Sequence, residues 1–108
     1  MAERKESSPK KGRRSGRREL AIPIRVFGTS VRGRDFSEDC VSLRVSPHGA
    51  LIRLRHSLIV DDTIRIMNLK TKKEAPFRVV GLAHNPPNEP YSDWGVEAVD
   101  PGENIWIE

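Results

Sequence analysis

Two short clusters in this sequence contain the residue types needed to hold an anionic ligand. The first is the arginine cluster of residues 13–18, in which Arg13 and Arg17 are separated by three residues that include Gly16. Arginine makes planar, paired hydrogen bonds to phosphates and to the O6/N7 edge of guanine, and its flat face stacks on bases. This cluster favours nucleotide or phosphate binding, although a solvated basic tail or a nonspecific nucleic-acid arm has the same composition.

The second cluster is Ser46-Pro47-His48-Gly49, which lies between two apolar stretches. At a tight hairpin, a serine hydroxyl and exposed backbone amides can bind an anion or a base edge. Glycine lets the backbone come close to a ligand, and we expect Gly49 to be free to take a positive φ. The alternative is a plain turn in which Ser46 bonds its own backbone and His48 is an ordinary turn residue.

The charge of the chain separates a basic arm from a nearly neutral body. Residues 1–18 contain eight basic and two acidic residues, whereas the other 90 contain 11 basic and 13 acidic ones, for a total net charge of +4. The arm is rich in Lys, Arg, Ser and Gly and has no apolar periodicity, which predicts disorder when free. We therefore predict two units, a flexible basic arm over 1–18 and one small domain over 19–108.

The body is expected to be all-β, because short alternating segments recur about every ten residues. Its predicted strands are residues 20–27, 36–45, 50–54, 63–69, 76–83 and 94–99. Pro23 cannot donate to a sheet, so its strand should lie at an edge or begin its pairing beside a gap. Residues 101–107 are expected to form a short helix with Asp100 as N-cap. Six such strands favour a small antiparallel barrel or sandwich.

Alternation also predicts which side chains share a face. Ile22, Ile24 and Val26 should point one way. In the next strand, alternation groups side chains of even number on one face and of odd number on the other. The first group is Cys40, Ser42 and Arg44, and the second is Val41, Leu43 and Val45. Trp94 and Trp106 are expected to fill the core or cap its end.

Several classes of protein are excluded by composition. No apolar run is long enough to span a membrane, and no secretory leader follows the first charges, so we expect a cytoplasmic protein. Cys40 is the only cysteine and is expected to be a small buried residue rather than a nucleophile. The three histidines lack metal-ligand spacing, and no phosphate-binding loop or catalytic triad motif is present. We therefore expect no enzyme activity, no metal and no cofactor.

Taken together, the two clusters resemble the signature of the PilZ domain, a family of small six-stranded barrels that bind the bacterial second messenger cyclic di-GMP. The family pattern is RxxxR ahead of the first strand and (D/N)xSxxG at the second hairpin. The matching segments are 13–17 and 44–49. Further similarity runs through 20–24, Gly49-Ala50-Leu51 and the ending from Trp94-Gly95-Val96-Glu97 to Trp106, so that it covers nearly the whole chain.

The resemblance implies a six-stranded antiparallel barrel and a set of ligand contacts. Arg13 and Arg17 would grip guanine edges and phosphates, with Arg14 as a phosphate contact. Ser46 and Gly49 would lie on the barrel face that receives a guanine. Because we expect no second domain, the output of such a receptor would come through a downstream protein partner that senses the closed arm, or through a change in self-association.

One position departs from the family pattern, because Arg44 stands where the family has Asp or Asn. A carboxylate or amide oxygen can accept from guanine N1–H and N2–H₂, whereas a guanidinium has donors only. Arg44 can instead pair with a phosphate or stack on a base. Weakened binding, altered geometry and lost binding all remain open, and losing one buried acceptor typically costs about 1–3 kcal/mol.

We therefore predict a cyclic di-GMP receptor domain in which the arm closes over the ligand on the barrel face. Two alternatives belong to other classes. One is a degenerate PilZ domain that binds no nucleotide and acts through protein–protein interaction, which Arg44 favours. The other is a small barrel that binds nucleic acid through its basic arm. The net charge of the body, which is −2, disfavours this nucleic-acid alternative.

Overall fold

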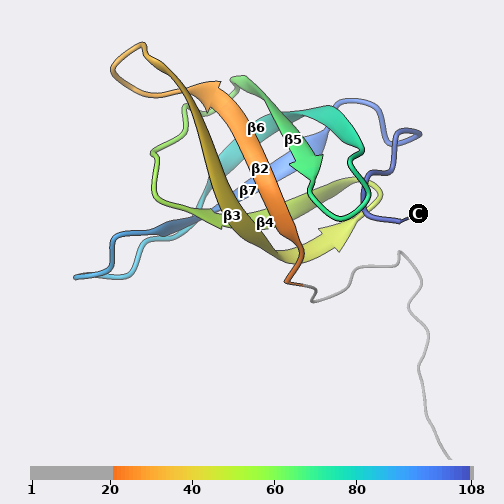
Figure 1. Cartoon of the computed structure of the whole chain (residues 1–108). Helices are drawn as coiled ribbons and strands as arrows, with labels where there is room; N and C mark the ends of the chain where they lie inside the picture. Colours follow the sequence, from red (N-terminus) through yellow and green to blue (C-terminus); the bar gives the residue numbers. More distant parts are fainter. Residues whose placement is uncertain (1–20, 108) are drawn as a thin grey trace, which may run out of the picture.

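A computed structural model of the chain describes residues 21–107, which form a closed antiparallel β-barrel (Figure 1). Its order around the barrel is β2-β3-β4-β7-β6-β5, and β5 pairs with β2 to complete the closure. The strands are β2 (Pro23–Thr29), β3 (Asp35–Ser46), β4 (Gly49–Leu54), β5 (Thr63–Asn68), β6 (Glu74–His84) and β7 (Ser92–Ala98). The predicted six-stranded barrel is confirmed, and the sandwich alternative is wrong.

The core fills the inside of this barrel with aliphatic and aromatic side chains. Ile22, Ile24 and Val26 are buried together, as alternation predicts for the first strand. Each of the other strands contributes inward side chains, chiefly Val45, Ile52, Leu54, Ile64, Ile66, Ala75, Phe77, Val79, Trp94 and Val96. Trp94 and Trp106 are both buried, which confirms their predicted place in the core.

The strand β3 contains a bulge that the sequence pattern did not predict. The register with β4 runs Val41↔Arg53 and Ser42↔Ile52, then shifts so that Arg44 pairs with Leu51. A bulge inserts one extra residue and so reverses the side-chain alternation beyond it. Ser42 is fully buried, Val41 is exposed and Val45 is buried. The prediction that Ser42 and Arg44 share a face is therefore wrong, because Arg44 is exposed.

Gly49 is the first residue of β4, and the prediction that glycine stands here to take a positive φ is wrong. Its φ is not positive, since Gly33 is the only glycine of residues 21–107 with a positive φ. A Cβ added at Gly49 would collide with the carbonyl oxygen of Val96 and lie 3.1 Å from the Cα of Glu97. Glycine is needed here because the hairpin between β3 and β4 packs directly against the backbone of β7.

Residues 101–107 form turns, so the predicted C-terminal helix is wrong. Asp100 does cap the first turn, because its side chain accepts from the N–H of Gly102 at 3.0 Å. The turn then ends at Asn104, whose side chain accepts from the N–H of Trp106 at 2.9 Å. These local side-chain bonds compete with helix formation. The described residues include no helix long and apolar enough to cross a membrane.

The strand boundaries otherwise follow the sequence closely. β2 begins at Pro23, three residues after the predicted start, and Leu20 lies outside the described residues. Because the barrel is closed, β2 is not an edge strand, and the other form of the prediction, that its pairing begins beside a gap, is confirmed. Pro23 is tolerated as the first residue of β2, where pairing with β5 begins only at Ile24.

Replacing Gly49 with alanine is expected to destabilise the barrel by about 1–3 kcal/mol, the usual range for overpacking. The added methyl must push against the backbone of β7, which cannot move as a side chain can. Urea unfolding of Gly49→Ala beside wild type measures the change. Gly81→Ala is the matched control, because a Cβ there meets no atom within 4 Å. Equal losses in both variants would contradict this account.

Candidate functional site

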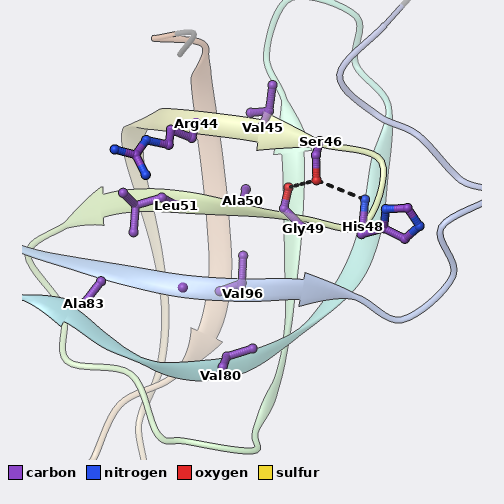
Figure 2. A pocket seen from close by; sticks show the side chains of 11 residues that line it. Arg44, Val45, Ser46, His48, Gly49, Ala50, Leu51, Val80, Ala83 and Val96 are labelled. Atoms are coloured by element: carbon purple, nitrogen blue, oxygen red, sulfur yellow. Dashed lines mark hydrogen bonds between the residues drawn. The ribbon is translucent and has the colours of Figure 1, made fainter. Parts of the chain in front are cut away.

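The barrel wall carries a pocket of about 410 Å³ on the four adjacent strands β3, β4, β7 and β6 (Figure 2). This volume lies within the roughly 300–1,000 Å³ typical of small-molecule sites. The lining residues are Arg44, Val45, Ser46, His48, Gly49, Ala50, Leu51, Val80, Ala83, Gly95 and Val96. The structure therefore brings three of the predicted site residues, Arg44, Ser46 and Gly49, to one pocket.

Polar groups lie at the two ends of the pocket. Arg44 and Leu51 are at one end, and Ser46 and His48 are at the other (Figure 2). Arg44 and Leu51 are register partners across β3 and β4, so the bulge in β3 places this guanidinium at the pocket. A ligand spanning the pocket would meet a cation at one end and a hydroxyl and an imidazole at the other.

The hydroxyl of Ser46 bonds within its own hairpin. It accepts from the N–H of His48 at 3.2 Å and donates to the carbonyl oxygen of Gly49 over a long 3.5 Å. The alternative prediction, a turn in which Ser46 bonds to the nearby backbone, is thus confirmed. A hydroxyl has one donor and two acceptor lone pairs, so it keeps an acceptor site for a ligand N–H.

The hairpin is held rigidly to β7. The N–H of Ala98 donates to the carbonyl oxygen of His48 at 2.7 Å, and Gly49 pairs with Glu97 in the β4–β7 register. Because Gly49 packs against the backbone of Val96, the loop cannot move outward without losing these bonds. The backbone bonds to β7 therefore fix the position of the hairpin that carries Ser46 and His48.

The apolar floor of the pocket was not predicted from the sequence. Ala50, Leu51, Val80 and Ala83 line the pocket, and none of them was proposed as a site residue. A signal was present, because Val80 lies on the face of its strand that alternation assigns to solvent and is 49% exposed. Single exposed apolar side chains are common on protein surfaces, so Val80 by itself does not locate the pocket.

Ile22, the residue directly before β2, is bonded close to this pocket. Ile22 donates its N–H to the hydroxyl of Ser42 at 3.0 Å and accepts from the N–H of Ser42 at 3.0 Å. Ser42 is two residues from Arg44 on the same strand. Residues 1–20 lie outside the described residues, and so do the predicted ligand contacts Arg13, Arg14 and Arg17.

A partly buried ion pair joins β4 to β7 beside the pocket. Arg53 pairs with Asp93 through two hydrogen bonds of 2.8 and 3.2 Å, two residues along from the Leu51↔Gly95 pair. The Arg53 guanidinium also lies 4.2 Å from the ring centroid of Tyr91, a cation–π arrangement. The hydrogen bonds from Arg53 lower the pKa of Asp93 against the opposing effect of burial, and His84 lowers it further.

Cys40 and the carboxylates do not form a reactive or metal-binding centre. Burial raises the pKa of the Cys40 thiol to about 12, and Glu38 and Asp39 add to the rise. The thiolate nucleophile is therefore suppressed at neutral pH. Within residues 21–107 no group of three or more His, Cys, Asp or Glu side chains is arranged to hold a metal ion.

Comparison with protein-family models, with curated proteins and with solved structures finds no match for this chain.

The lowered pKa of Asp93 predicts how stability depends on pH. Its ionised form is stabilised by Arg53 in the folded state, so this contribution is complete above the ordinary aspartate pKa of about 4. It is lost as the pH falls through the lowered pKa. Asp93→Asn should therefore be less stable than wild type at pH 7, by about 1.5 kcal/mol for a partly exposed partner.

Urea unfolding of both proteins between pH 7 and pH 2.5 tests this expectation. The difference in free energy of unfolding between wild type and Asp93→Asn should shrink below pH 4. Asp35→Asn, which removes an exposed carboxylate, is the control. A difference that stays constant down to pH 2.5 would show that the charge of Asp93 has no role.

Proposed function

We propose that this protein is a cyclic di-GMP receptor of the PilZ type. The observation that carries the proposal is the pocket on the outer barrel wall, where Ser46 and Gly49 lie at one end and Arg44 at the other. The three motif positions of segment 44–49, namely Arg44, Ser46 and Gly49, thus line a single pocket large enough for a small molecule. No catalytic group is required for this function.

The position of Ile22 supports a role for the arginines that precede it. Arg17 is five residues and Arg13 nine residues before Ile22, and an extended chain spans at most about 3.5 Å per residue. Arg17 can therefore reach about 17 Å, and Arg13 about 31 Å, from a point bonded to Ser42 beside the pocket. Both arginines are within reach of a ligand on this wall.

The chemistry of the pocket suits a guanine dinucleotide. Its floor is apolar and accommodates the faces of bases, while Arg44 supplies a cation for a phosphate. The hydroxyl of Ser46 retains an acceptor site for a base N–H. The arginines of residues 13–17 would complete the site by binding the remaining phosphate and the guanine O6/N7 edges.

In this proposal, ligand binding is itself the signal. The dinucleotide is bound between the arm and the barrel wall, and its greater affinity for that closed arrangement shifts the population toward it. A cytoplasmic partner protein then recognises the closed surface. The hairpin between β3 and β4, which is bonded to β7, would be part of the surface that the partner contacts.

Replacing either Arg13 or Arg17 with alanine is expected to weaken cyclic di-GMP binding about 10- to 150-fold. A hydrogen bond to a charged group contributes about 1.5–3 kcal/mol, which corresponds to that range. Isothermal titration calorimetry with cyclic di-GMP measures the affinity, and the melting temperature should stay unchanged because neither residue is part of the described barrel.

Arg32→Ala is the matched control for these variants, because it removes an exposed arginine from the turn between β2 and β3. It should bind as wild type does. Unchanged affinity in both Arg13→Ala and Arg17→Ala would reject the proposed clamp. Binding of a short DNA duplex in preference to cyclic di-GMP, with a steep salt dependence, would instead support the nucleic-acid alternative.

A second candidate function is favoured by Arg44. In a degenerate domain that acts only through protein–protein interaction, a donor-only side chain at this end of the pocket leaves the guanine N1–H and N2–H₂ groups without an acceptor. The chain would then keep the barrel and its pocket without nucleotide affinity.

Arg44→Asn distinguishes the two candidates. If the domain is degenerate, wild type should show no heat of binding with cyclic di-GMP, and Arg44→Asn should gain affinity because its amide oxygen accepts from guanine. The gain expected from one restored acceptor is about 5- to 150-fold. Micromolar binding by wild type would contradict the degenerate candidate. Arg44→Leu, which removes the charge and supplies no acceptor, controls for loss of charge alone.

A further inference from the structure

Gly95 lies at the centre of β7 and lines the pocket. Its neighbours in the chain, Trp94 and Val96, are buried in the barrel, so by alternation Gly95 faces outward. Its register partners are Leu51 on β4 and Gly81 on β6. Two glycines therefore face each other across β6 and β7 beside the apolar floor.

The fold gives no steric reason for glycine at position 95. Its φ is not positive, and a Cβ built there would meet only the carbonyl oxygen of Gly81, at an ordinary 3.8 Å. A Cβ at Gly81 would meet nothing within 4 Å. Gly49 is the opposite case, because a Cβ there would collide with the backbone of β7.

Glycine in the middle of a strand weakens the strand, since it has no side chain to pack and loses more conformational freedom on folding. Such a residue often marks a place where a ligand approaches the backbone closely. At Gly95 the space that a side chain would fill belongs to the pocket. The missing side chain is thus a feature of the binding surface rather than of the barrel.

We infer that Gly95 is a ligand-contact position, at which the flat face of a nucleobase packs directly on the backbone of β7. Leu51 flanks this position on β4, and Val80 and Ala83 of β6 also line the pocket. Gly81, the register partner of Gly95 on β6, also lacks a side chain, so no side chain from either of these two positions would stand between a planar ring and the backbone. This inference rests on the proposed function and assigns the base-binding surface within it.

The inference predicts opposite effects on stability and on binding. A methyl group at position 95 enters the pocket and separates the base from the backbone, and the branched side chain of valine fills the space further. The fold has room for either side chain, and valine has a high β propensity. Gly95→Ala and Gly95→Val should therefore melt at or above the wild-type temperature while losing affinity for the ligand.

Titration calorimetry with cyclic di-GMP and thermal unfolding of the full-length chain test the inference. Gly95→Val should bind about 5- to 150-fold more weakly than wild type, the range that overpacking by this amount produces. Gly95→Ala should fall between the two. Thr63→Val is the matched control, because it places the same side chain at an exposed position of β5, a strand that contributes no residue to the pocket.

Each outcome of this experiment separates the inference from the proposed function. Wild type that does not bind cyclic di-GMP overturns both. Wild type that binds, with Gly95→Val and Gly95→Ala binding equally well, overturns the inference alone. A melting temperature that falls in both variants also overturns it, because glycine would then be required by the fold. Loss of binding at an unchanged or raised melting temperature, with Thr63→Val unaffected, supports it.

Discussion

The bulge in β3 is the constraint on which the site depends. Without it, strict alternation would point Arg44 into the same interior that receives Ser42. The extra residue lets Ser42 and Val45 both be buried while Arg44 faces the pocket. Because Ser42 also holds Ile22 through two hydrogen bonds, the same local irregularity fixes the position of Ile22. One backbone feature thus positions both Arg44 and the bond to Ile22.

The glycines show how fold and function can be separated in one pocket. Gly49 is required by packing, since the hairpin contacts the backbone of β7 where a side chain would collide. Gly95 has space for a side chain and yet has none. In the sequence both glycines are simply part of the family-like pattern. Only the surroundings of each Cβ position reveal that the first stabilises the barrel and the second leaves the pocket open.

Strand positions could be predicted from the sequence because alternation of apolar and polar residues follows directly from burial of one face. The first strand shows this, with Ile22, Ile24 and Val26 all buried. The bulge was missed because apolar residues stand at every second position of the sequence here, at Val41, Leu43 and Val45. The extra residue in the backbone nevertheless reverses the faces of the side chains between Ser42 and Arg44. The helix after Asp100 was wrong because the Asn104 side chain bonds to the N–H of Trp106 and forms a turn. The apolar floor of the pocket could not be predicted from the sequence, because its residues lie on β4 and β6, and the order of the strands in the barrel determines that these lie near each other.

The charge of the pocket explains why the chain before β2 matters to the proposed function. Among the described residues that line the pocket, Arg44 is the only one with a permanent charge, whereas cyclic di-GMP carries two negative charges. In the proposed complex, Arg44 would supply one positive charge for the two negative charges of the ligand. In that complex a second cation would come from the arginines of residues 13–17, which precede Ile22 by five to nine residues in the chain. Ile22 is bonded to Ser42, two residues from Arg44.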